Sequence, residues 1–145
     1  MDQELIKNVV IAEVLAPVAA ANNTDSNSDI LDMAGYEGVI FIVPITDSVA
    51  NGVATLNVQE NTANSDTGMT TVDTATVTSA VNDDINGQLL VVAIHKPLKR
   101  YIQGNVVSAT QNIAFGNMIA IKYGAKKLPI TDDSTVSDVD SSVGV

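Results

Sequence analysis

The stretch Gly52-Val53-Ala54-Thr55-Leu56-Asn57-Val58-Gln59-Glu60 alternates between apolar and polar side chains. Successive side chains of a β-strand point to opposite faces of a sheet, so Ala54, Leu56 and Val58 fall on one face. The polar residues between them fall on the other face. One face of such a strand packs on a core while the other meets water, as in an antiparallel sheet that is covered on one side. The alternation therefore predicts a half-buried strand over residues 53–60.

Similar short segments lie on both sides of this stretch. The chain has 145 residues, among them 20 Val, 13 Ile and 13 Thr, and β-branched residues favour strands. Clusters of Asn, Gly, Asp and Ser separate the segments, which is typical of antiparallel all-β domains. We predict an all-β fold, an antiparallel β-sandwich with extended termini and a jelly roll as one candidate topology. The expected eight or so short strands are 8–15, 29–33, 38–45, 53–60, 70–78, 88–95, 100–109 and 117–123.

Two of these strands are apolar on both faces, Val39-Ile40-Phe41-Ile42-Val43-Pro44-Ile45 and Leu89-Leu90-Val91-Val92-Ala93-Ile94. An isolated sandwich needs only one apolar face on each strand. Either loops cover the outer face, which is the interpretation we favour, or the outer face meets another subunit.

The N-terminal segments are less regular. Residues 5–15 combine apolar residues at helical spacing with the β-branched run Val9-Val10-Ile11, and we favour a strand. Residues 21–28 contain no apolar anchor and predict an exposed loop, as do residues 61–68.

Charge divides the chain into three parts: an N-terminal arm with the first strand (1–27), a sandwich body (28–130) and an acidic C-terminal tail (131–145). The net charge is −10, from 17 acidic and 7 basic residues. Residues 1–37 hold seven acidic residues and one basic residue, and residues 131–145 hold four acidic residues and no basic one. Residues 38–130 are neutral, with six of each. We expect the acidic ends to act as arms that order on a neighbouring molecule.

Composition also disfavours several classes of protein. Direct nucleic-acid binding needs a clustered positive surface, which a chain of this charge does not favour. The apolar runs are far shorter than the ~20 residues that cross a bilayer, so we expect no membrane insertion. The acidic start, residues 1–7, does not resemble a secretory signal. The absence of cysteine leaves the fold without disulfides and suits assembly in a reducing cytoplasm.

No motif for catalysis or metal binding is complete. His95 is the only histidine, and no Gly-x-Ser-x-Gly sequence accompanies it. A zinc site is also disfavoured, because the chain offers one histidine and no cysteine as ligands. Residues 25–29 match the first five positions of a calcium loop, but Ile30 stands where glycine is required and Tyr36 where a glutamate is required. We therefore expect no enzyme, no cofactor and no metal.

The basic residues form two clusters after predicted strands, residues 96–100 and 122–127. They are either solvated strand ends and intramolecular partners, or a docking site for acidic arms of neighbouring subunits. The candidate inter-subunit contacts are Lys96, Lys99, Arg100, Tyr101, Lys122, Lys126 and Lys127.

Three stretches, residues 30–39, 99–107 and 119–130, resemble small structural proteins of tailed bacteriophages that are often met near the major capsid protein. Residues 58–61 resemble the family's Gln-Glu-Ser segment, with Asn61 in place of Ser. The resemblance covers residues 28–130. The family commonly shows Arg-Tyr-Val-Arg where this chain has Arg100-Tyr101-Ile102-Gln103, so a salt bridge made by the second arginine is absent here.

The resemblance implies a non-enzymatic capsid cement or decoration protein, made in the host cytoplasm, that binds the capsid exterior and stabilises subunit junctions. Its implied partners are the major capsid protein and further copies of itself, often as a trimer near local three-fold axes. Two alternatives remain open: a carbohydrate-binding or adhesin sandwich, which the 3% aromatic content disfavours, and a head-fibre base or head–tail connector subunit.

Overall fold

The computed structural model describes residues 5–139, which form eleven strands and one short 3₁₀ helix, η1 (Leu5–Lys7). Every strand pairing is antiparallel, which confirms the predicted all-β sandwich. The strands are β1 (Val10–Leu15), β2 (Val18–Ala21), β3 (Asp25–Asn27), β4 (Leu31–Asp32), β5 (Gly38–Ser48), β6 (Val53–Asn61), β7 (Thr70–Thr78), β8 (Leu89–His95), β9 (Tyr101–Ala109), β10 (Ile113–Phe115) and β11 (Met118–Tyr123).

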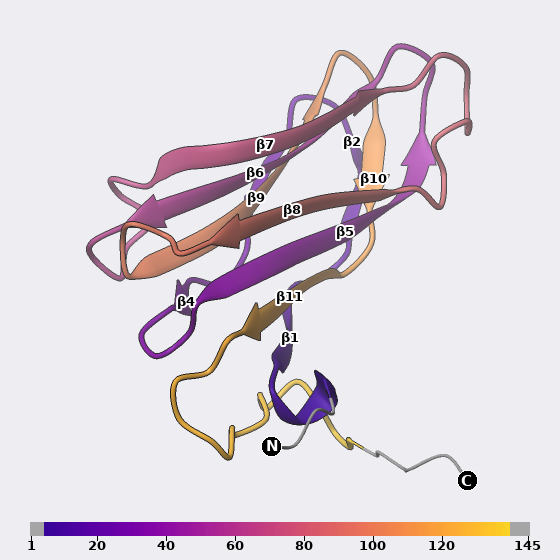
Figure 1. The fold of residues 1–145 in the computed structure, drawn as a ribbon. Coiled ribbons are helices and arrows are strands. Elements are labelled where there is room, and N and C mark those ends of the chain that lie inside the picture. The colour runs from indigo at the N-terminus through magenta and orange to yellow at the C-terminus, as the bar shows by residue number, and fades with distance from the viewer. Residues whose placement is uncertain (1–4, 140–145) are drawn as a thin grey trace, which may run out of the picture.

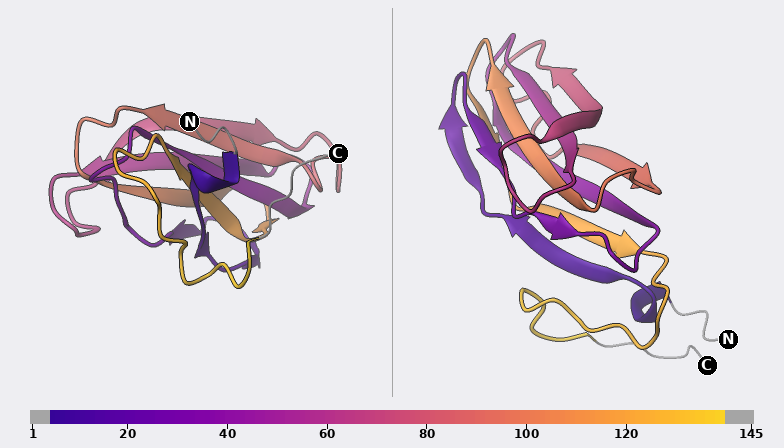
Figure 2. Two further views of the ribbon diagram at one scale, coloured as in Figure 1. Left: turned by 60° about the horizontal axis from the view of Figure 1, so that its bottom comes forward. Right: turned by 90° about the vertical axis from the view of Figure 1, so that its left-hand side faces the viewer.

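The strands lie in two stacked sheets (Figures 1 and 2). In the first sheet, β1 pairs with β11 and β2 pairs with β10. Both β11 and β10 pair with one side of β5, and β8 pairs with its other side. In the second sheet, β3 and β4 both pair with β9, followed by β6 and β7. If the interrupted strands are joined, eight strands remain, in the orders 1-8-3-6 and 2-7-4-5. This is the strand order of a jelly roll.

The core lies between the two sheets and follows the predicted alternation. In β6, Ala54, Leu56 and Val58 are fully buried, as the sequence predicts, and the polar residues between them face outward. In β5, Phe41 and Val43 point into the same core with no exposed surface. Each such large aliphatic or aromatic side chain contributes roughly 1.5–3 kcal/mol by burial.

One predicted loop is in part a strand. Within residues 21–28, β3 pairs with β9, so the prediction of an exposed loop is wrong for residues 25–27. The side chain of Asn105 in β9 donates hydrogen bonds to Asp25 and Asn27, so polar contacts anchor a segment that has no apolar side chain of its own. The strands β2 and β10 are also additional to the predicted set, and the first segment is a strand from Val10 onward.

The interpretation that loops cover the outer face of the doubly apolar strands is wrong for β8. Leu89 and Val91 point outward and are 58% and 49% exposed. The outward residues Ile40 and Ile42 of β5 are half-buried between their neighbouring strands. The first sheet therefore carries an apolar surface that the described residues leave open.

After β11 the chain returns beside β1, which lies at the edge of the first sheet opposite β8 (Figure 2). The backbone N–H of Glu13 donates to Thr135 Oγ1 at 2.9 Å. Val136 and Val139 line a small cavity with Ile6 and Val9. Residues 140–145 of the predicted tail, and residues 1–4 of the predicted arm, lie outside the described residues, and the ordering of these arms on a neighbour stays a prediction.

Candidate functional site: a basic end and an apolar sheet face

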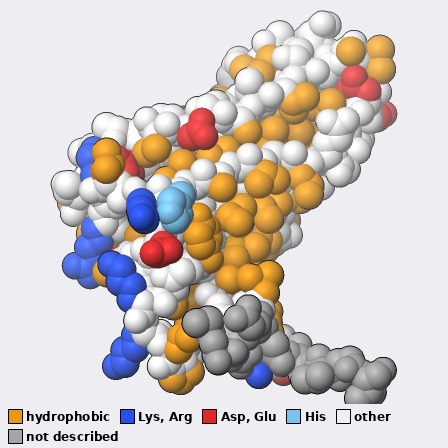
Figure 3. All heavy atoms as spheres, in the orientation of Figure 1, with side chains coloured by type: hydrophobic (Ala, Val, Ile, Leu, Met, Phe, Trp, Pro, Cys, Tyr) orange, Lys and Arg blue, Asp and Glu red, His pale blue; other side chains and the backbone are white. Residues whose placement is uncertain are grey.

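All seven basic residues of the chain lie at one end of the sandwich. The reason is antiparallel pairing, because β8 and β11 both end beside Gly38, the first residue of β5. The first residue of β1 is paired with Lys122 at the same end. Figure 3 shows the Lys and Arg side chains gathered there. We call this group the basic end: Lys7, Lys96, Lys99, Arg100, Lys122, Lys126 and Lys127.

Backbone hydrogen bonds join three loops into a corner at the basic end. The N–H of Lys96 donates to the carbonyl of Glu37 at 2.6 Å, and that of Lys126 donates to the carbonyl of Gly35 at 2.8 Å. The N–H of Met33 donates to the carbonyl of Arg100 at 2.8 Å. These loops enclose a cavity of about 430 Å³ that Lys96, Lys99, Arg100 and Lys126 line.

Arg100 forms a two-point ion pair inside this corner. Its Nε donates to Asp32 Oδ1 at 2.9 Å and its second guanidinium nitrogen donates to Oδ2 at 2.8 Å. The hydrogen bonds from Arg100 lower the pKa of Asp32 to about 2, and Asp32 in turn raises the pKa of Arg100. Arg100 also lies 5.3 Å from the centre of the Tyr101 ring. Its contacts hold β4 to the start of β9.

Two of the lysines contact neighbouring side chains. Lys122 Nζ lies 4.4 Å from the centre of the Tyr36 ring, and burial lowers the pKa of this lysine. Lys99 Nζ donates to Thr70 Oγ1 at 3.0 Å. Glu60, which is buried, accepts hydrogen bonds from the N–H groups of Leu98 and Lys99. These contacts fix the corner itself.

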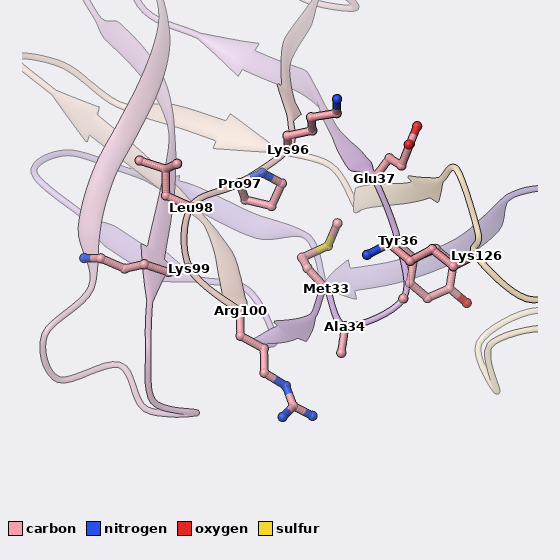
Figure 4. A pocket seen from close by; sticks show the side chains of 11 residues that line it. Met33, Ala34, Tyr36, Glu37, Lys96, Pro97, Leu98, Lys99, Arg100 and Lys126 are labelled. Carbon is pink, nitrogen blue, oxygen red and sulfur yellow. The ribbon is translucent and has the colours of Figure 1, made fainter.

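The remaining cations are exposed. Among the described residues, Lys96, Lys126 and Lys127 have no side-chain hydrogen bond or ion pair. Figure 4 shows that the side chains of Lys96, Lys99 and Arg100 point in different directions from the cavity. The structure therefore brings the predicted contact residues to one end, but it does not direct them toward one small ligand.

The second feature is the outer face of the first sheet. Ile11, Ile121, Ile40 and Ala93 are successive partners across four strands, and Ile119, Ile42 and Val91 form the next row. Figure 3 shows these strands as a continuous apolar area. We call it the apolar face: Ile11, Ile40, Ile42, Pro44, Leu89, Val91, Ala93, Ile119 and Ile121.

The apolar face ends at the basic end beneath a pair of rings. His95 Nδ1 and the Tyr123 hydroxyl are 3.2 Å apart, and the two rings are stacked with centres 6.1 Å apart. They meet over Gly38, where a Cβ would overlap the Tyr123 ring. Beside them is a groove of about 520 Å³, lined almost entirely by apolar side chains of η1, β1, β5, β8 and β11. His95 is thus a surface residue in a ring contact.

The aromatic residues are not arranged as a sugar-stacking platform. Phe41 and Phe115 are buried in the core. The rings of Tyr36, Tyr101 and Tyr123 are half-buried, and each contacts Lys122, Arg100 or His95, respectively. Apolar sugar faces bind to open aromatic rings. The carbohydrate-binding alternative therefore gains no supporting observation.

Over residues 5–139, no group of three or more His, Asp and Glu side chains is placed to hold a metal ion. The same residues contain no helix long and apolar enough to span a membrane.

Sequence reasoning identified the basic clusters and two of the four strands of the apolar face. It missed Ile11, Ile119 and Ile121. A signal was present, because residues 118–121 are apolar at every position, just as residues 39–43 are. The sequence predicts two doubly apolar strands, and the structure places them side by side with a third.

Known proteins share the fold of this chain. No family model matches the sequence, and no curated protein sequence does. Among solved structures, the PBSX exported protein XepA matches with a TM-score of 0.55 and 18% identity over 92% of this chain. The chain spans 43% of the length of XepA.

A structure described as Bacillus endospore appendages, a family of disulfide-linked pili, matches with a TM-score of 0.51 and 12% identity. That match covers 82% of this chain and 90% of the pilus chain. At these identities the similarities show the β-sandwich fold alone.

Proposed function

We propose that this chain is a non-enzymatic structural protein of a phage particle, a cement protein that binds the capsid exterior with its basic end. The observation that carries the proposal is the gathering of all seven basic residues at one end of the sandwich. The sequence resemblance over residues 28–130 and the fold shared with the PBSX exported protein XepA support it.

A docking end of this kind suits a repeated lattice. The exposed side chains of Lys96, Lys126 and Lys127 are free to contact carboxylates, while Arg100 and Lys122 hold the loops beneath them. Exposed ion pairs are individually weak. Many copies on a symmetric shell nevertheless bind together through multivalency, so weak contacts suffice to reinforce subunit junctions. In this proposal the protein is made in the host cytoplasm and ends on the capsid exterior.

The test uses empty capsids assembled from the major capsid protein encoded nearest to this chain. We expect the purified protein to co-sediment with these capsids and to raise their melting temperature. The double variant Lys126→Gln/Lys127→Gln should bind more weakly. Its matched control is Gln88→Glu/Gln111→Glu, which makes the same change in net charge at the opposite end and should bind like the unchanged protein.

Two outcomes would contradict the proposal. One is an unchanged capsid melting temperature at saturating protein. The other is an equal loss of binding in the two double variants, which would show that only net charge matters. Binding at a single capsid vertex would favour the fibre-base or connector alternative.

A further inference from the structure

The apolar face exposes aliphatic side chains to water, which is unfavourable unless another molecule covers them. Leu89 and Val91 are about half exposed, and their row partners Pro44, Ile42 and Ile119 are apolar, while Glu13 of β1 stands at the far end of the row beyond Ile119. Monomeric proteins rarely expose a continuous apolar area of this kind, and such areas mark binding sites for other macromolecules.

The chemistry of the face restricts what can cover it. Its nine side chains offer no hydrogen-bond donor or acceptor, so a polar ligand would lose its contacts with water and gain none in return. A flat aliphatic sheet face packs well against another flat aliphatic sheet face, about 10 Å away. A second copy of this chain supplies such a face.

The charges at the two ends favour one orientation of that second copy. The basic end lies at the last residues of β8 and β11, and its seven cations stand among acidic residues that include Asp32 on Arg100, Glu37 beside Lys96 and Lys126, and Asp132 beside Lys7. The opposite end, where β8 begins and β5 ends, carries Asp47, Asp83 and Asp84 and has no basic residue. Asp84 is held there by its hydrogen bond from Ser79, which lowers its pKa. Two copies with antiparallel strands would place each basic end beside an acidic end.

The relief of the face favours the same orientation. Its exposed large side chains, Leu89 and Val91, lie on the half of β8 nearer the acidic end. The apolar groove of about 520 Å³ lies toward the basic end, between η1 and the row formed by Ile121, Ile40 and Ala93. An antiparallel arrangement places the projecting side chains of each copy over the groove of the other.

We propose that the apolar face binds the same face of a second copy about a two-fold axis, with antiparallel strands and the basic end of each copy beside the acidic end of the other. A single self-complementary face closes a dimer, whereas a trimer requires two different surfaces. The dimer therefore differs from the trimer that the sequence resemblance implies. It does not depend on capsid binding, so each proposal can fail alone.

The first experiment measures the mass of the full chain by sedimentation equilibrium over a range of concentrations. We expect a dimer of two 15.1 kDa chains. Val91→Asp should raise the dissociation constant at least about 100-fold, because it places an unpaired charge in an apolar contact. The control is Val72→Asp on β7, where the valine is 45% exposed. The control should leave the dimer intact. A monomer, a trimer, or equal effects of the two substitutions would overturn the proposal.

The second experiment tests orientation and uses the absence of native cysteine. Ala80→Cys lies at the acidic end and Leu98→Cys at the basic end, both on exposed side chains. When chains labelled at position 80 are mixed with chains labelled at position 98, energy transfer should exceed that of either self-mixture. Strongest transfer between like positions would show parallel strands and overturn the antiparallel arrangement.

Discussion

The two sheets of this sandwich present opposite outer faces over one shared core. On the second sheet, Thr55 and Thr76 are hydrogen bonded at 3.0 Å, and Thr74 donates to Asn57 at 2.8 Å. Asn57 in turn donates to Asn105 at 3.1 Å. On the first sheet, the corresponding positions form the apolar face. The polar face is satisfied by cross-strand pairs and water, whereas the apolar face is complete only when something covers it.

This difference shows that the residues at inward positions are determined by packing in the core, whereas those at outward positions are determined by what the outer face contacts. Val43 of the first sheet and Val58 of the second are both fully buried, so the core makes the same demand on both sheets. The stability of the fold explains why both inner faces are apolar. Interaction with another molecule explains why only one outer face is apolar.

The largest expected effect tests whether the two inner faces are equivalent. Phe41→Ala in the first sheet should lower the free energy of unfolding by about 3–5 kcal/mol, and Leu56→Ala in the second sheet by about 2–5 kcal/mol. Both leave cavities in a close-packed core. Urea unfolding at concentrations at which the chain is monomeric measures these losses. The exposed Val91→Ala is the control, and a loss as large as that of Leu56→Ala would break the comparison.

The next effect tests whether the polar outer face depends on its hydrogen bonds. Asn105 is buried and contacts Asp25, Asn27 and Asn57. Asn105→Ala should lower the free energy of unfolding by about 1–3 kcal/mol, because it leaves several polar groups without their partner. Thermal unfolding provides the measurement. Asn117→Ala, which removes one exposed hydrogen bond to Glu13, should change little by comparison.

A smaller effect is expected where the apolar face is made polar. Leu89→Thr/Val91→Thr should change the stability of the monomer by no more than about 1 kcal/mol, because both side chains point into solvent and threonine favours strands. At concentrations at which the chain is monomeric, the same variant should bind much less of a dye that fluoresces on apolar surfaces than the unchanged protein does. Undiminished dye binding would show that the exposed apolar surface lies elsewhere.

The smallest effect concerns charge in the second sheet. The pKa of Asp32 falls from 3.8 to about 2 on folding, because Arg100 stabilises its charged form. The ion pair therefore stabilises the fold above about pH 4, and this contribution is lost as the pH falls to 2. Asp32→Asn should remove this part of the pH dependence of unfolding. The effect is small because both partners are largely exposed to water.

Much of the fold follows from the sequence, because alternation and turn residues act locally. All eight predicted strands are present. The segments that were missed depend on distant partners: β3 is polar and exists through its pairing with β9, and β10 is a three-residue strand between β2 and β5. Such strands carry almost no local signal.

The candidate site was predictable in its residues but not in its geometry. The sequence separates residues 96–100 from residues 122–127, and only the pairing of β8 and β11 with β5 places them at one end. Likewise, the sequence left open whether the outer face of Leu89 and Val91 is covered, because loop placement is not a local property.

The hydrogen bond between Glu13 and Thr135 has a further consequence for solubility. β1 is an outer strand, and unpaired outer strands invite open-ended addition of strands from other molecules. The backbone N–H of Glu13 donates to the side chain of Thr135 and is therefore not available to an added strand. A side chain, unlike an added strand, offers no further backbone groups to which another strand could pair. The segment after β11 thus blocks strand addition at this position of the β1 edge, while the apolar face stays available for a closed assembly.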